Sequence, residues 1–149
     1  MQLNNYKIEV VEGRKIIYPS KFKAPVTTKG LPKIYIITKN KKIVYVGITQ
    51  QPLRSRLRYG ENPPMGTGYS GYKWLDQKGE YGLHVVVFNS SKRIIDIETT
   101  EAELVYKIRK SYGQWPEFQT EIHFHKSNKR HRDIADAIFN QVLIFSNRK

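Results

Sequence analysis

Residues 33–47, KIYIITKNKKIVYVG, are the stretch that decides the fold of this chain. β-branched and aromatic residues fill 34–38 and again 43–46, and such residues favour β-strands. The four residues between them, 39–42, are all Lys or Asn and favour a turn. The stretch therefore predicts an antiparallel β-hairpin.

Downstream of this hairpin, the pattern predicts three helices, a loop and one more strand. Thr49 can cap the first helix, and Pro52 stands near its start, where proline is tolerated. The loop holds four glycines and two prolines, and Gly113 stops the second helix. The predicted elements are a helix over 52–58, a loop over 60–71, a strand over 83–88, a helix from Thr99 or Thr100 to about Tyr112, and a helix over about 130–145.

Upstream, two short strands around Glu12-Gly13-Arg14 predict an N-terminal hairpin. Residues 20–32 carry two prolines, one glycine and three lysines, which indicates an extended connector basic enough to touch phosphate. The expected fold class is α+β, with a small three-stranded antiparallel sheet flanked by helices. The expected parts of this one compact domain are an N-terminal hairpin and basic arm (1–31), a core (32–120) with an inserted loop (60–72), and a basic tail with a C-terminal helix (121–149).

The charge balance points to a polyanionic partner. The chain has 149 residues, about one domain, and 26 Lys and Arg against 13 Asp and Glu leave a net charge of +13. Such a charge suits nucleic acid or an anionic membrane surface. No apolar run approaches the roughly 18 residues of a membrane span, and the start has no signal-peptide core. Without cysteine there is no disulfide and no Cys-based zinc site. We expect a cytoplasmic protein that binds nucleic acid and no membrane.

One carboxylate aligns with the apolar face of the helix predicted to end at Tyr112. Glu101 stands at the head of a stripe that contains Val105 and Ile108. Because an unpaired buried charge is destabilising, Glu101 must either have a partner or bend out to water. The helix alone favours the second reading, a first-turn glutamate that interacts with the helix dipole.

The helix over 53–60 separates its arginines. Arg56 borders the core side, whereas Arg54 and Arg58 lie together on another face. We expect the latter two to contact phosphate without taking part in chemistry. Tyr35 and Tyr45 come from adjacent strands of the central hairpin, where packing is the usual role of tyrosine, although their hydroxyls also supply polar groups.

The histidines of the tail allow a metal site. In a strand, His123 and His125 share a face that could bind a metal ion. With Asn128 and His131 they also invite a His-Asn-His nuclease interpretation. That motif needs a ββα unit longer than this nine-residue span, so we favour exposed basic residues near DNA.

Four fragments occur in the order found in a known nuclease family. They are Lys33-Ile34-Tyr35, Tyr45-Val46-Gly47, Arg56 and Glu101. This arrangement resembles the GIY-YIG nuclease family and covers about residues 32–120. YVG-ITQQPL-RSRL is similar to the family's YIG-K-x-x-x-L-x-x-R with one extra residue, and EAELV is similar to E-A-x-L-I. In the run WPEFQ, Gln119 stands where the family's P-x-x-N has asparagine. The departures are Lys33 for the first glycine, Ile48 for the lysine after YIG, and Gly60, beside Tyr59, where many members carry His or Tyr.

The resemblance implies a GIY-YIG core that hydrolyses a DNA phosphodiester with one Mg²⁺, for which Mn²⁺ can substitute. It implies that Glu101 is the metal's one protein carboxylate, which suits an ion that keeps several waters. Arg56 would offset charge on the phosphoryl oxygens. Tyr35 or Tyr45 would position the attacking water and take its proton, for which cationic surroundings must lower the tyrosine pKa. The groups that could activate the water are Tyr35, Tyr45, Tyr59 and Lys42.

Terminal extensions around such a core favour a small type II restriction endonuclease that cuts double-stranded DNA. We expect it to act as a homodimer, because a recognition site with two-fold symmetry is matched by a protein with two-fold symmetry. The alternatives are a structure-selective or phage-type nuclease of the same fold and a non-catalytic basic nucleic-acid-binding protein. We expect specificity from the loop over 60–72 and the tail over 119–132, unless both only hold phosphate. The residues predicted to contact DNA are Arg54, Arg58, Tyr69, Tyr72, Lys73, Gln119, His123, His125, Asn128 and Arg130.

Overall fold

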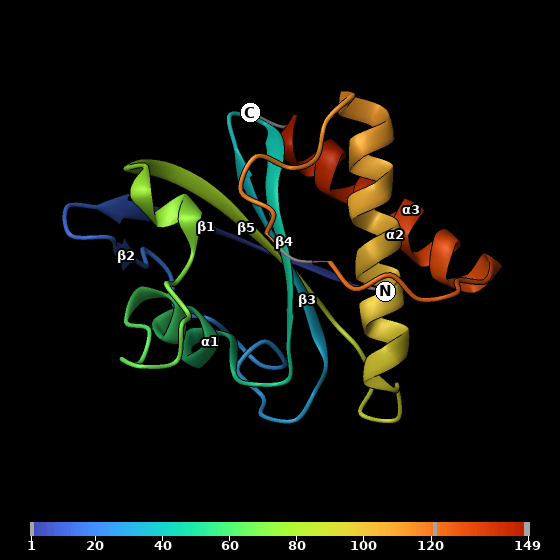
Figure 1. The fold of residues 1–149 in the computed structure, drawn as a ribbon, viewed down its shortest axis with the longest axis horizontal. Coiled ribbons are helices and arrows are strands. Elements are labelled where there is room, and N and C mark those ends of the chain that lie inside the picture. The colour runs from blue at the N-terminus through green and yellow to red at the C-terminus, as the bar shows by residue number, and fades with distance from the viewer. Residues whose placement is uncertain (1, 121, 148–149) are drawn as a thin grey trace.

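One antiparallel sheet of five strands, in the order β2-β1-β5-β3-β4, organises the chain. The computed structural model describes residues 2–120 and 122–147. α1 and the short 3₁₀ helix η1 lie on one side of the sheet, and α2 and α3 lie on the other (Figure 1). The elements are β1 (Leu3–Val11), β2 (Lys15–Ile17), β3 (Lys33–Lys39), β4 (Lys42–Thr49), α1 (Leu53–Glu61), η1 (Lys73–Asp76), β5 (Gly79–Val87), α2 (Ile94–Tyr112) and α3 (Lys129–Ser146).

The central hairpin forms as predicted. β3 pairs with β4 from Lys33 opposite Thr49 to Lys39 opposite Lys42. Asn40 and Lys41 make the turn with φ of 52° and 67°, the pair of positive values that a tight two-residue hairpin turn requires. The α+β class is confirmed, and so are the α3 helix and the end of α2 at Gly113, whose φ is 77°.

The N-terminal hairpin is not a separate arm. β1 pairs with β5 over eight positions, from Leu3 opposite Val86 to Val10 opposite Gly79, so the predicted three-stranded sheet of β5, β3 and β4 grows to five strands. This pairing covers the edge of β5, which would otherwise expose unpaired backbone groups.

The expected start of the second predicted helix is wrong. α2 begins at Ile94, several residues before Thr99 and Thr100. The two threonine hydroxyls donate to the carbonyls of Ile95 and Asp96, four residues back, so they lie inside the helix and do not cap it. Residues 122–128 form no strand, so the tail histidines do not share a strand face.

The two faces of the sheet bury two separate cores. β3 is buried from Lys33 to Thr38 because it is a central strand covered on both sides. Tyr35 and Ile37 point toward α1 and η1, while Ile34 and Ile36 point toward α2 and α3. The central strand thus directs Tyr35 into the α1 side. No helix in the described ranges is both long and apolar enough to cross a lipid bilayer.

Lys33, which stands where the resemblance places a glycine, is completely buried. Its ammonium group donates to the carbonyls of Thr28, Leu31 and Gln51 at 2.7–2.9 Å. All three donors of the lysine are therefore satisfied. These bonds tie the connector before β3 to the turn before α1, a role that sequence reasoning missed.

The buried His84 makes the folded protein less stable at acidic pH. Its ring nitrogens bond with the Thr38 hydroxyl at 3.0 Å and the Asn5 side-chain oxygen at 2.7 Å. Burial lowers the pKa of His84 from 6.5 to about 4, so between these values the unfolded chain binds a proton that the folded protein does not. The stability that neutral His84 contributes is fully present above the pKa of the unfolded chain. The free energy of unfolding then decreases by roughly 3 kcal/mol as the pH falls through the pKa of the folded protein.

We therefore expect His84→Gln to lack this acid-dependent loss in urea unfolding measured across that pH range. His123→Gln, which changes an exposed histidine, is the control and should follow the wild type. If His84→Gln keeps the pH dependence of the wild type, His84 is not the group responsible.

Candidate active site

The two tyrosines of the central hairpin meet on the α1 side of the sheet. Tyr35 is fully buried, and its ring lies across the backbone of Gly47, its partner in register on β4. A Cβ atom at residue 47 would lie 2.5 Å from the Cζ and hydroxyl oxygen of Tyr35. The Tyr45 ring centroid lies 6.1 Å from that of Tyr35. The glycine after Tyr45-Val46 is thus required because a tyrosine occupies the place of its side chain.

Arg56 extends from α1 toward these rings. Its guanidinium carbon lies 4.8 Å from the Tyr72 ring centroid, and Nη2 donates to the Tyr69 hydroxyl at 3.3 Å. The other terminal nitrogen, Nη1, is buried and has no hydrogen-bond partner among the described residues. An unsatisfied buried donor is destabilising and needs an explanation. Nη1 is therefore available to a bound anion.

Glu101 stands on α2, which packs against the edge strand β4. It is 8% exposed, and neither a hydrogen bond nor a positive charge from a described residue offsets the effect of burial on its carboxylate. The expectation that Glu101 is a first-turn glutamate that bends out to water is wrong. α2 begins at Ile94, so residue 101 lies well inside the helix, and its side chain is on the buried face. Burial, and then the negative charge of Glu98 one turn before it, raise the pKa of Glu101 to about 8.

The tyrosine hydroxyls are not acidified. Burial raises the pKa of Tyr35, Tyr45 and Tyr72 well above the usual 10, and the positive charge of Arg56 offsets only part of this effect. The charge of Glu101 makes a smaller contribution to the raised pKa of Tyr45. The expectation that cationic surroundings lower these pKa values is wrong, and at neutral pH the three hydroxyls are neutral hydrogen-bonding groups.

The other two candidates for activating water differ in position. Tyr59 is half exposed and stacks on Tyr69 with ring centroids 5.2 Å apart, close to Arg56. Lys42 is exposed at the hairpin turn, opposite Lys39. That position is four residues along β3 from Tyr35, or about 13 Å at 3.3 Å per residue, which separates Lys42 from the site.

Three predicted DNA contacts have roles inside the fold. Tyr72 is 3% exposed, and its hydroxyl lies 2.7 Å from that of Tyr35. The Gln119 side chain bonds to both the N–H and the C=O of Val46 at 2.9 Å, so it covers the edge of β4 like a short strand. Asn128 caps α3 through a reciprocal pair of bonds with His131. For these three side chains, the assignment as free DNA readers needs correction.

Two histidines of the tail contact acidic side chains of α2. Nε2 of His125 lies 3.6 Å from the Glu98 carboxylate, and Nε2 of His131 lies 2.9 Å from Asp96. Hydrogen bonds from His131 and Arg93 lower the pKa of Asp96. The remaining predicted DNA contacts are Tyr69, which bonds to Arg56 as described, and five exposed side chains, Arg54, Arg58, Lys73, His123 and Arg130.

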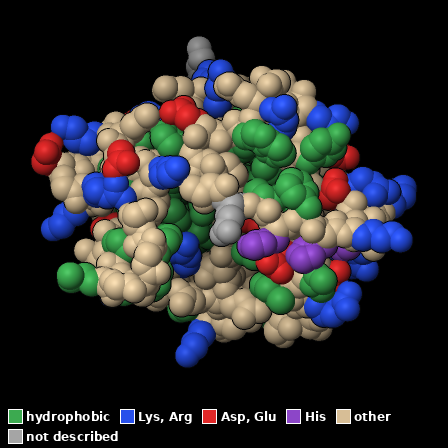
Figure 2. All heavy atoms as spheres, in the orientation of Figure 1, with side chains coloured by type: hydrophobic (Ala, Val, Ile, Leu, Met, Phe, Trp, Pro, Cys, Tyr) green, Lys and Arg blue, Asp and Glu red, His purple; other side chains and the backbone are tan. Residues whose placement is uncertain are grey.

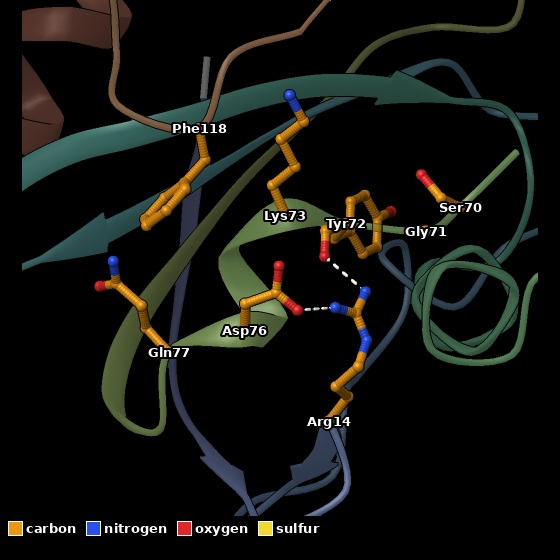
Figure 3. A pocket seen from close by; sticks show the side chains of 8 residues that line it. All are labelled: Arg14, Ser70, Gly71, Tyr72, Lys73, Asp76, Gln77 and Phe118. Carbon is orange, nitrogen blue, oxygen red and sulfur yellow. Dashed lines mark hydrogen bonds and ion pairs between the residues drawn. The ribbon is translucent and has the colours of Figure 1, made fainter.

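A pocket of about 450 Å³ adjoins the tyrosine cluster, since Tyr72 lines it together with Lys73 and Phe118 (Figure 3). Arg14 reaches across its wall and donates to the Tyr72 carbonyl at 2.9 Å and to Asp76. In Figure 2, hydrophobic side chains are visible in a hollow between α1, η1 and the edge strand β4, and both basic and acidic side chains lie on the surface around it. The tyrosine cluster thus lies beside an open pocket, with which it shares Tyr72.

The carboxylates of the described residues do not form a multi-ligand metal site, so they suit only a cation that keeps most of its water ligands. Among residues 2–120 and 122–147, no three His, Cys, Asp or Glu side chains cluster as metal ligands. A buried carboxylate without a protein partner suits Mg²⁺, which takes one or two carboxylates together with waters and phosphate oxygens. Glu101 is the residue that would hold it.

Comparison of the chain with protein families, with curated proteins and with solved structures finds no match. The assignment of the site therefore depends on its own geometry and on the four sequence fragments. Sequence reasoning placed Tyr35, Tyr45, Arg56 and Glu101 in one site. The structure brings the first three together around Tyr72, whereas Glu101 stands on the other side of the sheet, on the helix that packs against the strand of Tyr45. Sequence reasoning missed Tyr72 as a member, because no local pattern shows that a loop tyrosine returns to β3.

The raised pKa of Glu101 predicts that its charge destabilises the metal-free protein. The carboxyl group has a pKa of 4.5 when unfolded and about 8 when folded, so its contribution is favourable below 4.5 and is lost as the pH rises through 8. In EDTA at the alkaline end of this range, Glu101→Gln should unfold at a higher urea concentration than the wild type, with a free energy of unfolding larger by on the order of 4 kcal/mol. Below the unfolded pKa the two proteins should be alike. Glu103→Gln, on the same helix, is the control and should show no such gain; an equal gain would show that the effect is general to α2.

Proposed function

We propose that this protein is a metal-dependent DNA endonuclease of the GIY-YIG type, which hydrolyses phosphodiester bonds. The observation that carries this proposal is the buried, unpartnered Nη1 of Arg56, whose guanidinium group lies against Tyr72 and next to the neutral hydroxyls of Tyr35 and Tyr45. A phosphoryl oxygen is an acceptor that such a guanidinium group binds well. The four fragments that resemble the family supply the same residues in the same order.

Each residue has a distinct task in this proposal. Arg56 binds a non-bridging oxygen and offsets the charge that grows there as water attacks phosphorus and the P–O3′ bond breaks. The hydroxyls of Tyr35 and Tyr45 hold the attacking water by hydrogen bonds. Because their pKa values are raised, the proton of that water must leave to solvent or to another group. When bound at Glu101, Mg²⁺ would supply charge stabilisation for the phosphate and the leaving oxygen.

Double-stranded DNA is the proposed substrate because the net charge of +13 favours a polyanion. The finer proposal is a type II restriction endonuclease that acts as a homodimer. It is supported by the additions around the core, namely the β1–β2 hairpin and the α3 helix. Incubation of plasmid DNA with the protein and Mg²⁺ tests both levels. Discrete fragments with a common end sequence support the restriction enzyme, a smear supports a nuclease of other selectivity, and intact DNA contradicts catalysis.

Arg56 and Arg54 should differ in the kind of defect that their loss causes. Arg56→Ala removes the donor for the phosphoryl oxygen and should lower kcat by about 10²-fold or more. The Arg54 guanidinium lies 4.0 Å from the Tyr18 ring on the exposed face of α1. Arg54→Ala should weaken DNA binding and reduce the slope of its salt dependence by about one, as should Arg58→Ala. Equal losses of kcat in all three variants would contradict the distinction.

Glu101→Gln should abolish cleavage but not DNA binding. The change removes the metal ligand together with a negative charge near the phosphate, so binding measured by fluorescence anisotropy in EDTA should equal or exceed that of the wild type. Glu103→Gln should cut normally. Cleavage by Glu101→Gln at the wild-type rate in Mg²⁺ would show that Glu101 holds no essential metal.

A further inference from the structure

Two glycines bring a loop tyrosine into the tyrosine cluster. Gly60 lies in the last turn of α1, and a Cβ atom there would overlap the ring of Tyr72. Gly71 has a φ of 86°, a conformation that other residues rarely adopt, and a Cβ atom there would overlap the carbonyl oxygen of Gly60. The chain can therefore approach α1 closely enough for the Tyr72 ring to occupy the space beside Gly60.

The Tyr72 ring is held from several sides. Its centroid lies 5.2 Å from that of Trp74 and 5.5 Å from that of Tyr45. The Tyr72 carbonyl accepts a hydrogen bond from Arg14, which anchors the backbone as well. A ring fixed in this way can hold other groups in place, because its own movement is restricted by packing.

Tyr72 contacts two groups to which the proposed reaction assigns a task. Its hydroxyl lies 2.7 Å from the hydroxyl of Tyr35, and both are buried. Such a pair has two hydrogens, of which one lies in the shared bond and the other is left for a substrate or water. The face of the Tyr72 ring also attracts the Arg56 guanidinium, 4.8 Å from the ring centroid.

We propose that Tyr72 is a positioning residue of the active site, which orients the hydroxyl of Tyr35 and directs the unpartnered Nη1 of Arg56 toward the phosphate. This inference rests on the proposed function, since it assigns Tyr72 a part in that same reaction. It replaces the sequence-based expectation that Tyr72 lies in a surface loop and reads DNA.

The hydroxyl is tested by Tyr72→Phe, which retains the ring. If Tyr72 orients Tyr35, kcat should fall by about 10²-fold, because misplacing a reacting group slows the reaction by about this factor. KM for DNA should stay near the wild-type value. Tyr18→Phe is the matched control, because it removes a buried tyrosine hydroxyl that has no partner among the described residues. It should keep the wild-type kcat.

The packing is tested without any activity measurement by a double-mutant cycle. Gly60→Ala should lower the midpoint of urea unfolding in the wild type, because the new methyl group collides with the Tyr72 ring. In the Tyr72→Ala background the same change should raise the midpoint, since alanine is favoured over glycine in a helix when space is available. Equal effects in both backgrounds would overturn the placement of Tyr72.

The outcomes separate this inference from the function on which it rests. A wild-type protein that cuts no DNA in Mg²⁺ overturns the proposed function, and the positioning role with it. A wild type that cuts, with Tyr72→Phe cutting equally fast or losing only KM, overturns the positioning role alone. A fall in kcat at unchanged KM, with a normal Tyr18→Phe control and a cycle that changes sign, supports it.

Discussion

The absence of a side chain at two positions is the constraint on which the site depends. Gly47 leaves room on β4 for the ring of Tyr35, and Gly60 leaves room on α1 for the ring of Tyr72. With both rings in place, their hydroxyls meet at 2.7 Å and Arg56 lies against the second ring. Any larger residue at either glycine would force the rings apart, because protein interiors have little empty volume to absorb the displacement.

The site combines groups that an ordinary core avoids. Arg56 has a buried nitrogen without a partner, and Glu101 has a buried carboxylate with a raised pKa. Both features lower the stability of the free protein. A bound anion would pair with Arg56, and a bound cation would pair with Glu101. Such local conflicts are typical of functional sites, where the surrounding structure compensates for them. Here the compensation comes from the two apolar cores on either side of the sheet.

Much of the architecture was predictable because its signals are local. Two runs of β-branched and aromatic residues, 34–38 and 43–46, with a polar turn between them specify the hairpin, and Gly113 specifies the end of α2. The start of α2 was misjudged because Thr99 and Thr100 are good capping residues, yet their hydroxyls bond equally well to carbonyls inside a helix. The pairing of β1 with β5 was not predictable, since it joins segments about seventy to eighty residues apart and no local pattern indicates which strand pairs with which.

The sequence by itself determined which residues could form the site: two tyrosines on paired strands, an arginine at the border of a helix face and a glutamate at the head of an apolar stripe. These follow from the periods of strands and helices, which act over a few residues. Only the tertiary structure decided that Tyr72 joins them, that Gln119 covers the edge of β4, and that burial raises the tyrosine pKa values. The physical reason is that desolvation and contact depend on every element packed around a group, and those elements lie far apart in the chain.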